Sequence, residues 1–186
     1  MELGAYVGAY LDETAEIARR IDRGRIAAAI ERLRSVRSLG GRLFILGVGG
    51  SAANASHAVN DFRKIGGLEA YAPTDNVAEL TARVNDESWE TVFANWLKTS
   101  KLNADDCLLI FSVGGGSGSA SLNLVRAMEY AKEVGAEIVS IVSRDGGHAA
   151  RVSDVCILVP VVAQERITPH AEGWQAVVWH LLVNAL

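Results

Sequence analysis

The sequence is poor in the residues that build disulfide scaffolds and in the long apolar runs that cross membranes. Its two cysteines among 186 residues are too few for a disulfide-rich framework. Cys107 and Cys156 both fall in expected strands, and we interpret them as buried, reduced thiols. The apolar runs are far shorter than the roughly 20 residues of a membrane span, and residues 1–5 have no basic region of a signal peptide. The sequence therefore predicts a cytoplasmic protein with no membrane partner.

The charge and the composition narrow the class of protein further. The net charge is −4 and the chain has no basic block, which argues against a nucleic-acid partner. Hydrophobic residues make up 49% of the chain and charged residues 22%, as in globular proteins that bury a core. A length of 186 residues fits one domain, so we expect residues 1–186 to form a single unit.

Short apolar runs alternate with helical patterns along the chain. Two expected helices, at residues 5–20 and 25–38, form an N-terminal extension for packing or oligomerisation, and residues 42–186 form the core. Helices that alternate with strands cover both faces of a parallel sheet. The pattern predicts a three-layer α/β/α, doubly wound, flavodoxin-like fold. Its five strands are expected at residues 42–47, 68–71, 107–112, 137–142 and 155–159, and its main helices at residues 51–64, 77–84, 87–100, 121–134 and 171–186.

Two loops rich in glycine and serine, each directly after an apolar strand, are the strongest functional signal. In the first, residues 47–51, Ser51 is the expected N-cap of the following helix. A loop that leads from a strand into a helix binds anions, because backbone N–H groups and the helix dipole point at the ligand. Both loops lie at the carboxyl edge of one sheet, so we expect them to surround one phosphorylated ligand. The expected phosphate-binding residues are Gly49, Gly50, Ser51, Ser112, Gly114, Gly115, Gly116, Ser117 and Ser119.

A dinucleotide-binding fold is an alternative interpretation of the first loop. Residues 47–52 match G-x-G-x-x-A, and Glu69 lies about 20 residues further on, where such folds place a ribose-binding acid. However, Glu69 falls inside the weak segment 66–73 instead of ending a strong apolar strand. The second loop would also have no role in such a site. The two loops together favour a sugar phosphate and no nucleotide cofactor.

Five motifs follow one another along nearly the whole chain. They are Gly47-Val48-Gly49-Gly50-Ser51-Ala52-Ala53-Asn54-Ala55-Ser56-His57, the pair Asn85-Asp86, residues 112–119, Asp145-Gly146-Gly147 and Trp179-His180-Leu181-Leu182. In order and spacing they resemble the sugar isomerase (SIS) domain family, and within it the phosphoheptose isomerases. The resemblance implies interconversion of sedoheptulose 7-phosphate and D-glycero-D-manno-heptose 7-phosphate, in the synthesis of heptose for lipopolysaccharide or capsule. It also implies a homotetramer with active sites between subunits, and a bound zinc.

The chain departs from the family pattern at several positions. Val48 stands where the family usually has asparagine, and Ser112-Val113-Gly114-Gly115-Gly116-Ser117, with extra residues after it, replaces Ser-Thr-Ser-Gly-Asn-Ser. Asp61 corresponds to a glutamate regarded as the catalytic base, and Glu172 to a glutamine. Val48 and Asp61 leave a second hypothesis open, in which the chain is a non-catalytic phosphosugar-binding or assembly protein.

An aldose–ketose isomerase needs a base, an acid and a group that stabilises an oxyanion. His57 and Asp61 are four residues apart in an expected helix and so share one face. The resemblance implies Asp61 and His180 as the catalytic pair and Asp86 as a sugar-site residue. His57, Asp61, Glu172 and His180 form a candidate N2O2 zinc set.

Each of these residues also has a structural interpretation. His57 and His180 can be core or capping residues, Asp61 a solvated charge, and Asp86 a helix cap. His170 is open between a surface loop and the cleft, whereas His148 is expected in a loop. The aromatic residues of the last helix, Trp174 and Trp179, are expected in the core or in a subunit interface, with a sugar-binding platform as the alternative.

Overall fold

The computed structural model describes residues 2–186, whose five strands form one parallel sheet. The sheet order is β2-β1-β3-β4-β5, the flavodoxin-like order of a doubly wound fold, which confirms the predicted fold class. The order reverses between β1 and β3, and ligands of such sheets bind beyond the carboxyl ends of the strands at this point. The strands are β1 (Arg42–Leu46), β2 (Glu69–Tyr71), β3 (Cys107–Phe111), β4 (Glu137–Val142) and β5 (Val155–Leu158), all within the predicted ranges.

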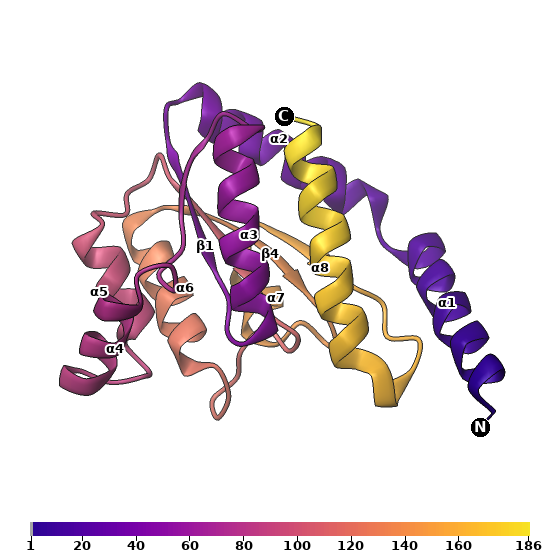
Figure 1. The fold of residues 1–186 in the computed structure, drawn as a ribbon. Helices are drawn as coiled ribbons and strands as arrows, with labels where there is room; N and C mark the ends of the chain where they lie inside the picture. Colours follow the sequence, from indigo (N-terminus) through magenta and orange to yellow (C-terminus); the bar gives the residue numbers. More distant parts are fainter. Residues whose placement is uncertain (1) are drawn as a thin grey trace.

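Two helical layers cover the sheet (Figure 1). One core cluster joins the sheet to α2 (Arg23–Ser38), α3 (Gly50–Lys64) and α8 (Ile167–Asn184). A second cluster joins its other face to α5 (Val92–Thr99), α6 (Leu122–Val134) and α7 (Gly147–Val152), beside α4 (Val77–Asp86). In β1, Leu43 and Ile45 belong to the first cluster and Phe44 and Leu46 to the second. Because both faces are buried, the strands appear in the sequence as continuous apolar runs.

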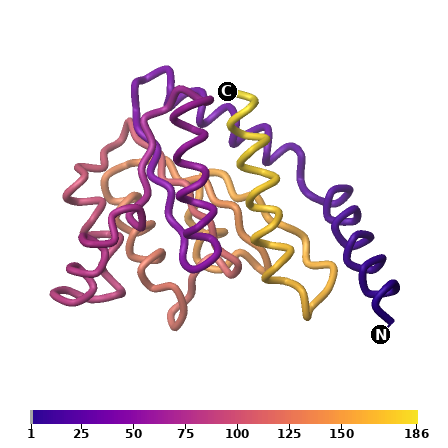
Figure 2. The backbone as a smooth tube through the Cα atoms, in the orientation of Figure 1, coloured from indigo at the N-terminus to yellow at the C-terminus, as the bar shows by residue number. Residues whose placement is uncertain are grey.

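The helix α1 (Leu3–Arg20) projects from the three layers, as the ribbon and the backbone trace show (Figures 1 and 2). Its Glu13 carboxylate accepts a 2.8 Å hydrogen bond from Nε of Arg166 and lies 2.8 Å from Nε2 of the buried His170. Arg166 and His170 lower the pKa of Glu13 to about 2. These contacts fix α1 to the beginning of α8, and they hold His170 buried in a helix and not in the surface loop that was one of its two expected locations. The apolar side chains of α1 that remain exposed are Leu3, Tyr6, Val7 and Leu11.

Several helices begin elsewhere than predicted, and α1 and α2 each start two residues early. The N-cap of α3 is Gly49, with φ 63°, and not Ser51, which lies inside the first turn. The helix expected at residues 87–100 is limited to α5. The helix α8 begins four residues before the predicted start, because a proline such as Pro169 is tolerated in a first turn, where its missing N–H would have no intrahelical partner.

The two cysteines lie in strands, as predicted, and both are free thiols. Cys107 is fully buried in β3, and burial raises the pKa of its thiol. Cys156 in β5 is only partly buried, since β5 is the last strand of the sheet. Trp174 and Trp179 both lie in the core, in agreement with the first of their two expected locations. Within residues 2–186, no helix is both long and apolar enough to cross a bilayer.

Candidate active site

The helices α3 and α8 bring three metal-ligating side chains together on the outer side of their layer. One ligand atom each of His57, Asp61 and His180 lies within 4.8 Å of the others. Oδ2 of Asp61 is 3.9 Å from Nε2 of His57 and 3.8 Å from Nε2 of His180. Two ligands of a tetrahedral zinc ion are separated by roughly 3.4 Å at ordinary bond lengths. The set of two imidazoles and one carboxylate therefore fits a divalent metal in both chemistry and spacing.

Neighbouring groups orient the ligands of this cluster. Nδ1 of His180 is 2.7 Å from the carbonyl oxygen of Ala176, so in the neutral imidazole Nδ1 carries the proton and Nε2 keeps its lone pair. The amide of Asn60 donates to Oδ1 of Asp61 at 2.7 Å, which leaves Oδ2 for the histidines. The ring of Trp179 stacks on His180 and meets the edge of His57. A lone pair and a carboxylate oxygen that face each other are stabilised by a cation between them.

The cluster opens towards the surface of the chain. The side chains of His57 and His180 are 59% and 46% exposed, whereas Asp61 is only 13% exposed. Asp61 is thus covered by the two histidines, and a bound ion could be reached from outside the helical layer. The sequence also allowed His57 and His180 to be buried core residues. Their exposed side chains show that neither is.

The structure does not bring Glu172 into this cluster. Its carboxylate lies against the first turn of α3, where a Cβ atom on Gly50 would be 2.5 Å from a carboxylate oxygen. Glu172 and His180 are eight residues apart in α8, about 12 Å along a helix. The positive end of the α3 dipole attracts the carboxylate to its present place. Glu172 therefore occupies the anion-binding end of α3, and the predicted four-residue metal set is reduced to three.

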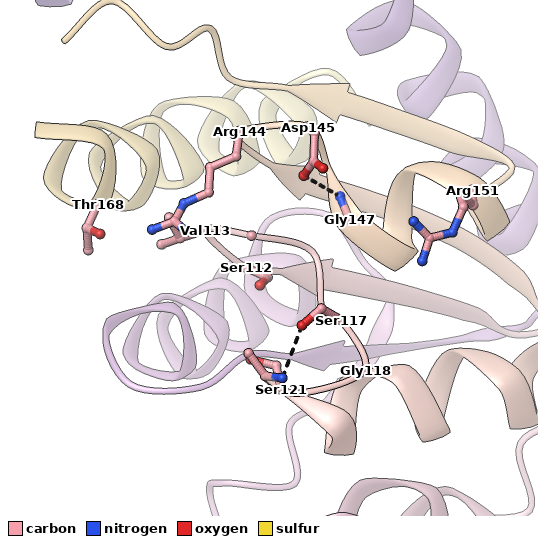
Figure 3. Close-up of a pocket in the computed structure, with 13 residues that line it drawn as sticks. Ser112, Val113, Ser117, Gly118, Ser121, Arg144, Asp145, Gly147, Arg151 and Thr168 are labelled. Atoms are coloured by element: carbon pink, nitrogen blue, oxygen red, sulfur yellow. Dashed lines mark hydrogen bonds between the residues drawn. The ribbon is translucent and has the colours of Figure 1, made fainter. Parts of the chain in front are cut away.

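A separate cavity of about 410 Å³ lies beyond the carboxyl ends of β3 and β4 (Figure 3). Four of the predicted phosphate-binding residues line it, namely Ser112, Gly114, Gly116 and Ser117. Of the described residues that line this cavity, none belongs to the first loop. Ser51 is only 2% exposed, because the close approach of Gly47 to the backbone of Ser51 packs β1 against the first turn of α3. The expectation that both loops surround one phosphate within the chain is therefore not met.

The second loop is held in shape by its own hydroxyl groups and by α7. Ser112 Oγ accepts the N–H of Gly115, and Ser117 Oγ accepts the N–H of Ala120. Because these hydroxyls act as acceptors, their protons are free to be donated to a ligand. The carbonyl groups of Gly115 and Gly116 accept N–H groups from the first turn of α7. Gly115 thus supports the loop from behind, and the exposed Ser119 lies next to Ser117 without lining the cavity.

Gly147 explains the Asp145-Gly146-Gly147 motif. Its φ is 51°, and a Cβ atom there would overlap the carbonyl oxygens of Gly114 and Gly116. Its N–H donates to Oδ1 of Asp145 at 3.1 Å (Figure 3). The loop after β4 therefore packs against the loop after β3 backbone to backbone, which only glycine permits.

Several cavity residues were not predicted from the sequence. Arg144, Arg151, Ser121 and Thr168 all line it. Arg144 follows β4 at the carboxyl edge of the sheet, and this position could have identified it as a site residue. The others come from the ends of helices, where the sequence shows no motif. Asp86, at the end of α4, accepts a 2.7 Å hydrogen bond from Asn85 and lies outside both the cavity and the metal cluster.

Comparisons with known proteins agree with this geometry. A family profile for the SIS domain matches residues 9–143. A probable phosphoheptose isomerase of Thermoplasma volcanium is 31% identical over 155 residues, which are 81% of this chain and 76% of that protein. The phosphoheptose isomerase of Geotalea daltonii is 31% identical over 167 residues, which are 87% and 82% of the two chains.

The fold also matches a solved structure of a phosphoheptose isomerase. The phosphoheptose isomerase of Neisseria gonorrhoeae superposes with a TM-score of 0.85 at 26% identity, over 98% of each chain. The profile match covers more than half of the chain, and both relatives exceed 30% identity over most of their length. With its parallel sheet, its glycine-rich loops and the histidine–aspartate cluster, the chain belongs to the SIS-domain family, in its phosphoheptose isomerase branch.

Proposed function

We propose that this chain is an aldose–ketose isomerase that interconverts sedoheptulose 7-phosphate and D-glycero-D-manno-heptose 7-phosphate. The observation that carries the proposal is the convergence of His57, Asp61 and His180 in a chain of the phosphoheptose isomerase branch. The product would serve the synthesis of heptose for lipopolysaccharide or capsule. We place the reaction in the cytoplasm, in keeping with two cysteines that form no disulfide.

The chemistry requires a proton to move between two adjacent carbons of the sugar. The Asp61 carboxylate is the base that takes the proton from one carbon and returns it to the adjacent carbon, and His180 is the acid that supplies a proton to the developing oxyanion through Nε2 while no metal occupies that nitrogen. A zinc ion held by His57, Asp61 and His180 would take the place of this acid, because it would polarise the carbonyl and stabilise the same charge. Three protein ligands are also the number found in catalytic zinc sites, which keep one position for substrate or water.

We propose that the phosphate of the substrate lies in the cavity of the second loop. The hydroxyls of Ser112 and Ser117 have protons to donate, and Gly114 and Gly116 line the same cavity with N–H groups that have no acceptor among residues 2–186. The first loop has a different role. There the carboxylate of Glu172 already lies at the end of α3, and a second anion would be repelled.

The two halves of the site favour a homotetramer with active sites between subunits. The metal cluster lies on the outer side of α3 and α8, about 15 Å beyond Ser51 along α3. The phosphate cavity lies at the carboxyl ends of β3 and β4. We propose that a second copy of the chain contributes its cavity to this cluster, with the apolar face of α1 in the interface. Size-exclusion chromatography with light scattering tests this point, and a monomer at micromolar concentration would contradict it.

Turnover by the purified chain tests the proposed reaction. We expect NMR spectra of sedoheptulose 7-phosphate, recorded with the protein and added zinc, to show the aldoheptose 7-phosphate. The alternative, a non-catalytic phosphosugar-binding protein, predicts binding of the sugar phosphate without product. If neither the natural chain nor Asp61→Glu, which restores the family's residue, forms product with zinc, the isomerase proposal is wrong.

A further inference from the structure

The phosphate cavity contains two arginine side chains, Arg144 and Arg151. Arg144 comes from the loop after β4, and Arg151 comes from α7. Within residues 2–186, neither guanidinium forms an ion pair, whereas Arg126 on the neighbouring helix pairs with Glu129 at 2.9 Å. The one acidic residue of the lining, Asp145, is engaged with the N–H of Gly147. The cavity therefore has an excess of positive charge, and an anionic ligand would neutralise it.

Arg144 lies where the loop lacks side chains. The second loop has valine and glycine at positions 113 and 114, so neither side chain offers a hydrogen-bond donor to a ligand. A Cβ atom on Gly114 would be 3.9 Å from Cδ of Arg144, so the arginine side chain lies directly over this glycine. Figure 3 shows the Arg144 guanidinium beside Val113 and Thr168, and Arg151 on the other side of the loop.

The backbone of Arg144 is held in an unusual conformation. Its φ is 56°, in the left-handed region that residues with a side chain rarely adopt. The loop around it is fixed by the Ser143 N–H, which donates to the carbonyl of Val113, and by the Gly146 N–H, which donates to Ser143. Two backbone hydrogen bonds thus direct Arg144 toward the second loop. Glycine or asparagine would adopt the positive φ of position 144 with less strain.

We infer that Arg144 binds the phosphoryl group of the substrate and supplies the hydrogen-bond donors that the side chains of Val113 and Gly114 lack. A guanidinium donates two parallel hydrogen bonds to phosphate oxygens and stays charged at every physiological pH. In the described part of the chain, the N–H groups of Gly114 and Gly116 have no acceptor, so they are free to bind the same anion. The inference rests on the proposed function, which makes a sugar phosphate the ligand.

Titration calorimetry on the full chain tests this role, with sedoheptulose 7-phosphate and inorganic phosphate as the two probes. We expect Arg144→Gln to raise the dissociation constants of both probes by about tenfold to a hundredfold. Arg144→Lys keeps the positive charge but loses the planar guanidinium. We expect its dissociation constants to lie between those of the natural chain and those of Arg144→Gln. Arg126→Gln removes the same charge outside the cavity, and we expect a change of less than twofold.

A second variant separates binding from folding. Arg144→Gly removes the side chain and permits a positive φ, so we expect weaker binding with no loss of thermal stability. The inference is overturned if Arg144→Gln and Arg144→Gly bind both probes within twofold of the natural chain. It is also overturned if Arg151→Gln loses affinity and Arg144→Gln does not. Arginine-dependent binding without any turnover would leave this inference intact and contradict the isomerase proposal instead.

Discussion

Nε2 of His180 lies 3.8 Å from Oδ2 of Asp61, although the two residues belong to helices from opposite ends of the α/β core. The proton on Nδ1 of His180 is directed at the Ala176 carbonyl, and Oδ1 of Asp61 accepts from Asn60. The remaining lone pairs of both residues therefore face each other, with His57 as the third donor. An arrangement of this kind is favourable when a cation lies between the donors.

Metal content is the first prediction. We expect the natural chain to bind one zinc ion per protomer, and His57→Ala and His180→Ala each to lose it, because two ligands hold zinc far more weakly than three. Mass spectrometry of the metal content measures the stoichiometry. His148→Ala is the matched control, since His148 lies outside the cluster and should leave zinc binding unchanged. Full zinc occupancy in both ligand variants would contradict the assignment.

Two glycines of the first loop should respond differently to alanine. A Cβ atom on Gly47 would overlap the backbone of Ser51, so we expect Gly47→Ala to lower the free energy of unfolding by about 1–3 kcal/mol. On Gly50 the three atoms nearest to a Cβ atom all belong to the carboxyl group of Glu172, which can rotate away. We expect Gly50→Ala to change stability by less than about 1 kcal/mol, because alanine also favours the helix. Urea unfolding measures both, and equal losses would contradict this account of the loop.

Gly147 should be essential for the phosphate cavity. In Gly147→Ala the new methyl group would overlap the carbonyl oxygens of Gly114 and Gly116 and strain a residue with positive φ. We expect a loss of about 1–3 kcal/mol in stability and weaker binding of inorganic phosphate. Gly118→Ala is the control, because a Cβ atom there meets nothing within 4 Å. Unchanged phosphate affinity in Gly147→Ala would show that this contact does not shape the cavity.

The junction between α1 and α8 should depend on pH. Arg166 and His170 lower the pKa of Glu13 from its ordinary 4.5 to about 2 in the folded chain. Glu13 thus binds a proton more readily in the unfolded chain than in the folded chain. The stabilisation that the ionised Glu13 gives to the folded chain is full above pH 4.5 and is lost as the pH falls towards 2. We expect the difference in unfolding free energy between the natural chain and Glu13→Gln to shrink over this range.

Urea unfolding at pH 7, 4.5 and 3 measures that difference. Glu16→Gln is the matched control on the same helix, because its pair with Arg19 is exposed and should contribute little at any pH. A difference between the natural chain and Glu13→Gln that stays constant from pH 7 to 3 would contradict the assigned pKa.

The strands could be predicted because each is buried on both faces, so that Leu43, Phe44, Ile45 and Leu46 are all apolar. His57 and Asp61 could be paired because residues four apart share one face of a helix. These features depend on neighbours in the sequence. They needed no knowledge of how α3 and α8 meet.

The features that the sequence did not predict depend on contacts between distant segments. Ser51 is buried because Gly47 lets β1 approach it, and Glu172 lies at the end of α3 because α8 begins beside that end. Arg144 enters the cavity because Gly114 leaves space for its side chain. A loop motif predicts an anion site, whereas the groups that surround such a loop are set by tertiary packing.

The rate at which aldoheptose 7-phosphate forms from sedoheptulose 7-phosphate tests the central claim most directly. We propose to follow it by NMR with saturating zinc in the natural chain, in Asp61→Asn and in the control His148→Ala. The account predicts product with the natural chain and with His148→Ala, and a rate lower by about 10²–10⁴-fold in Asp61→Asn, the usual contribution of a general base. No product from the natural chain, or an equal rate in Asp61→Asn, would contradict it.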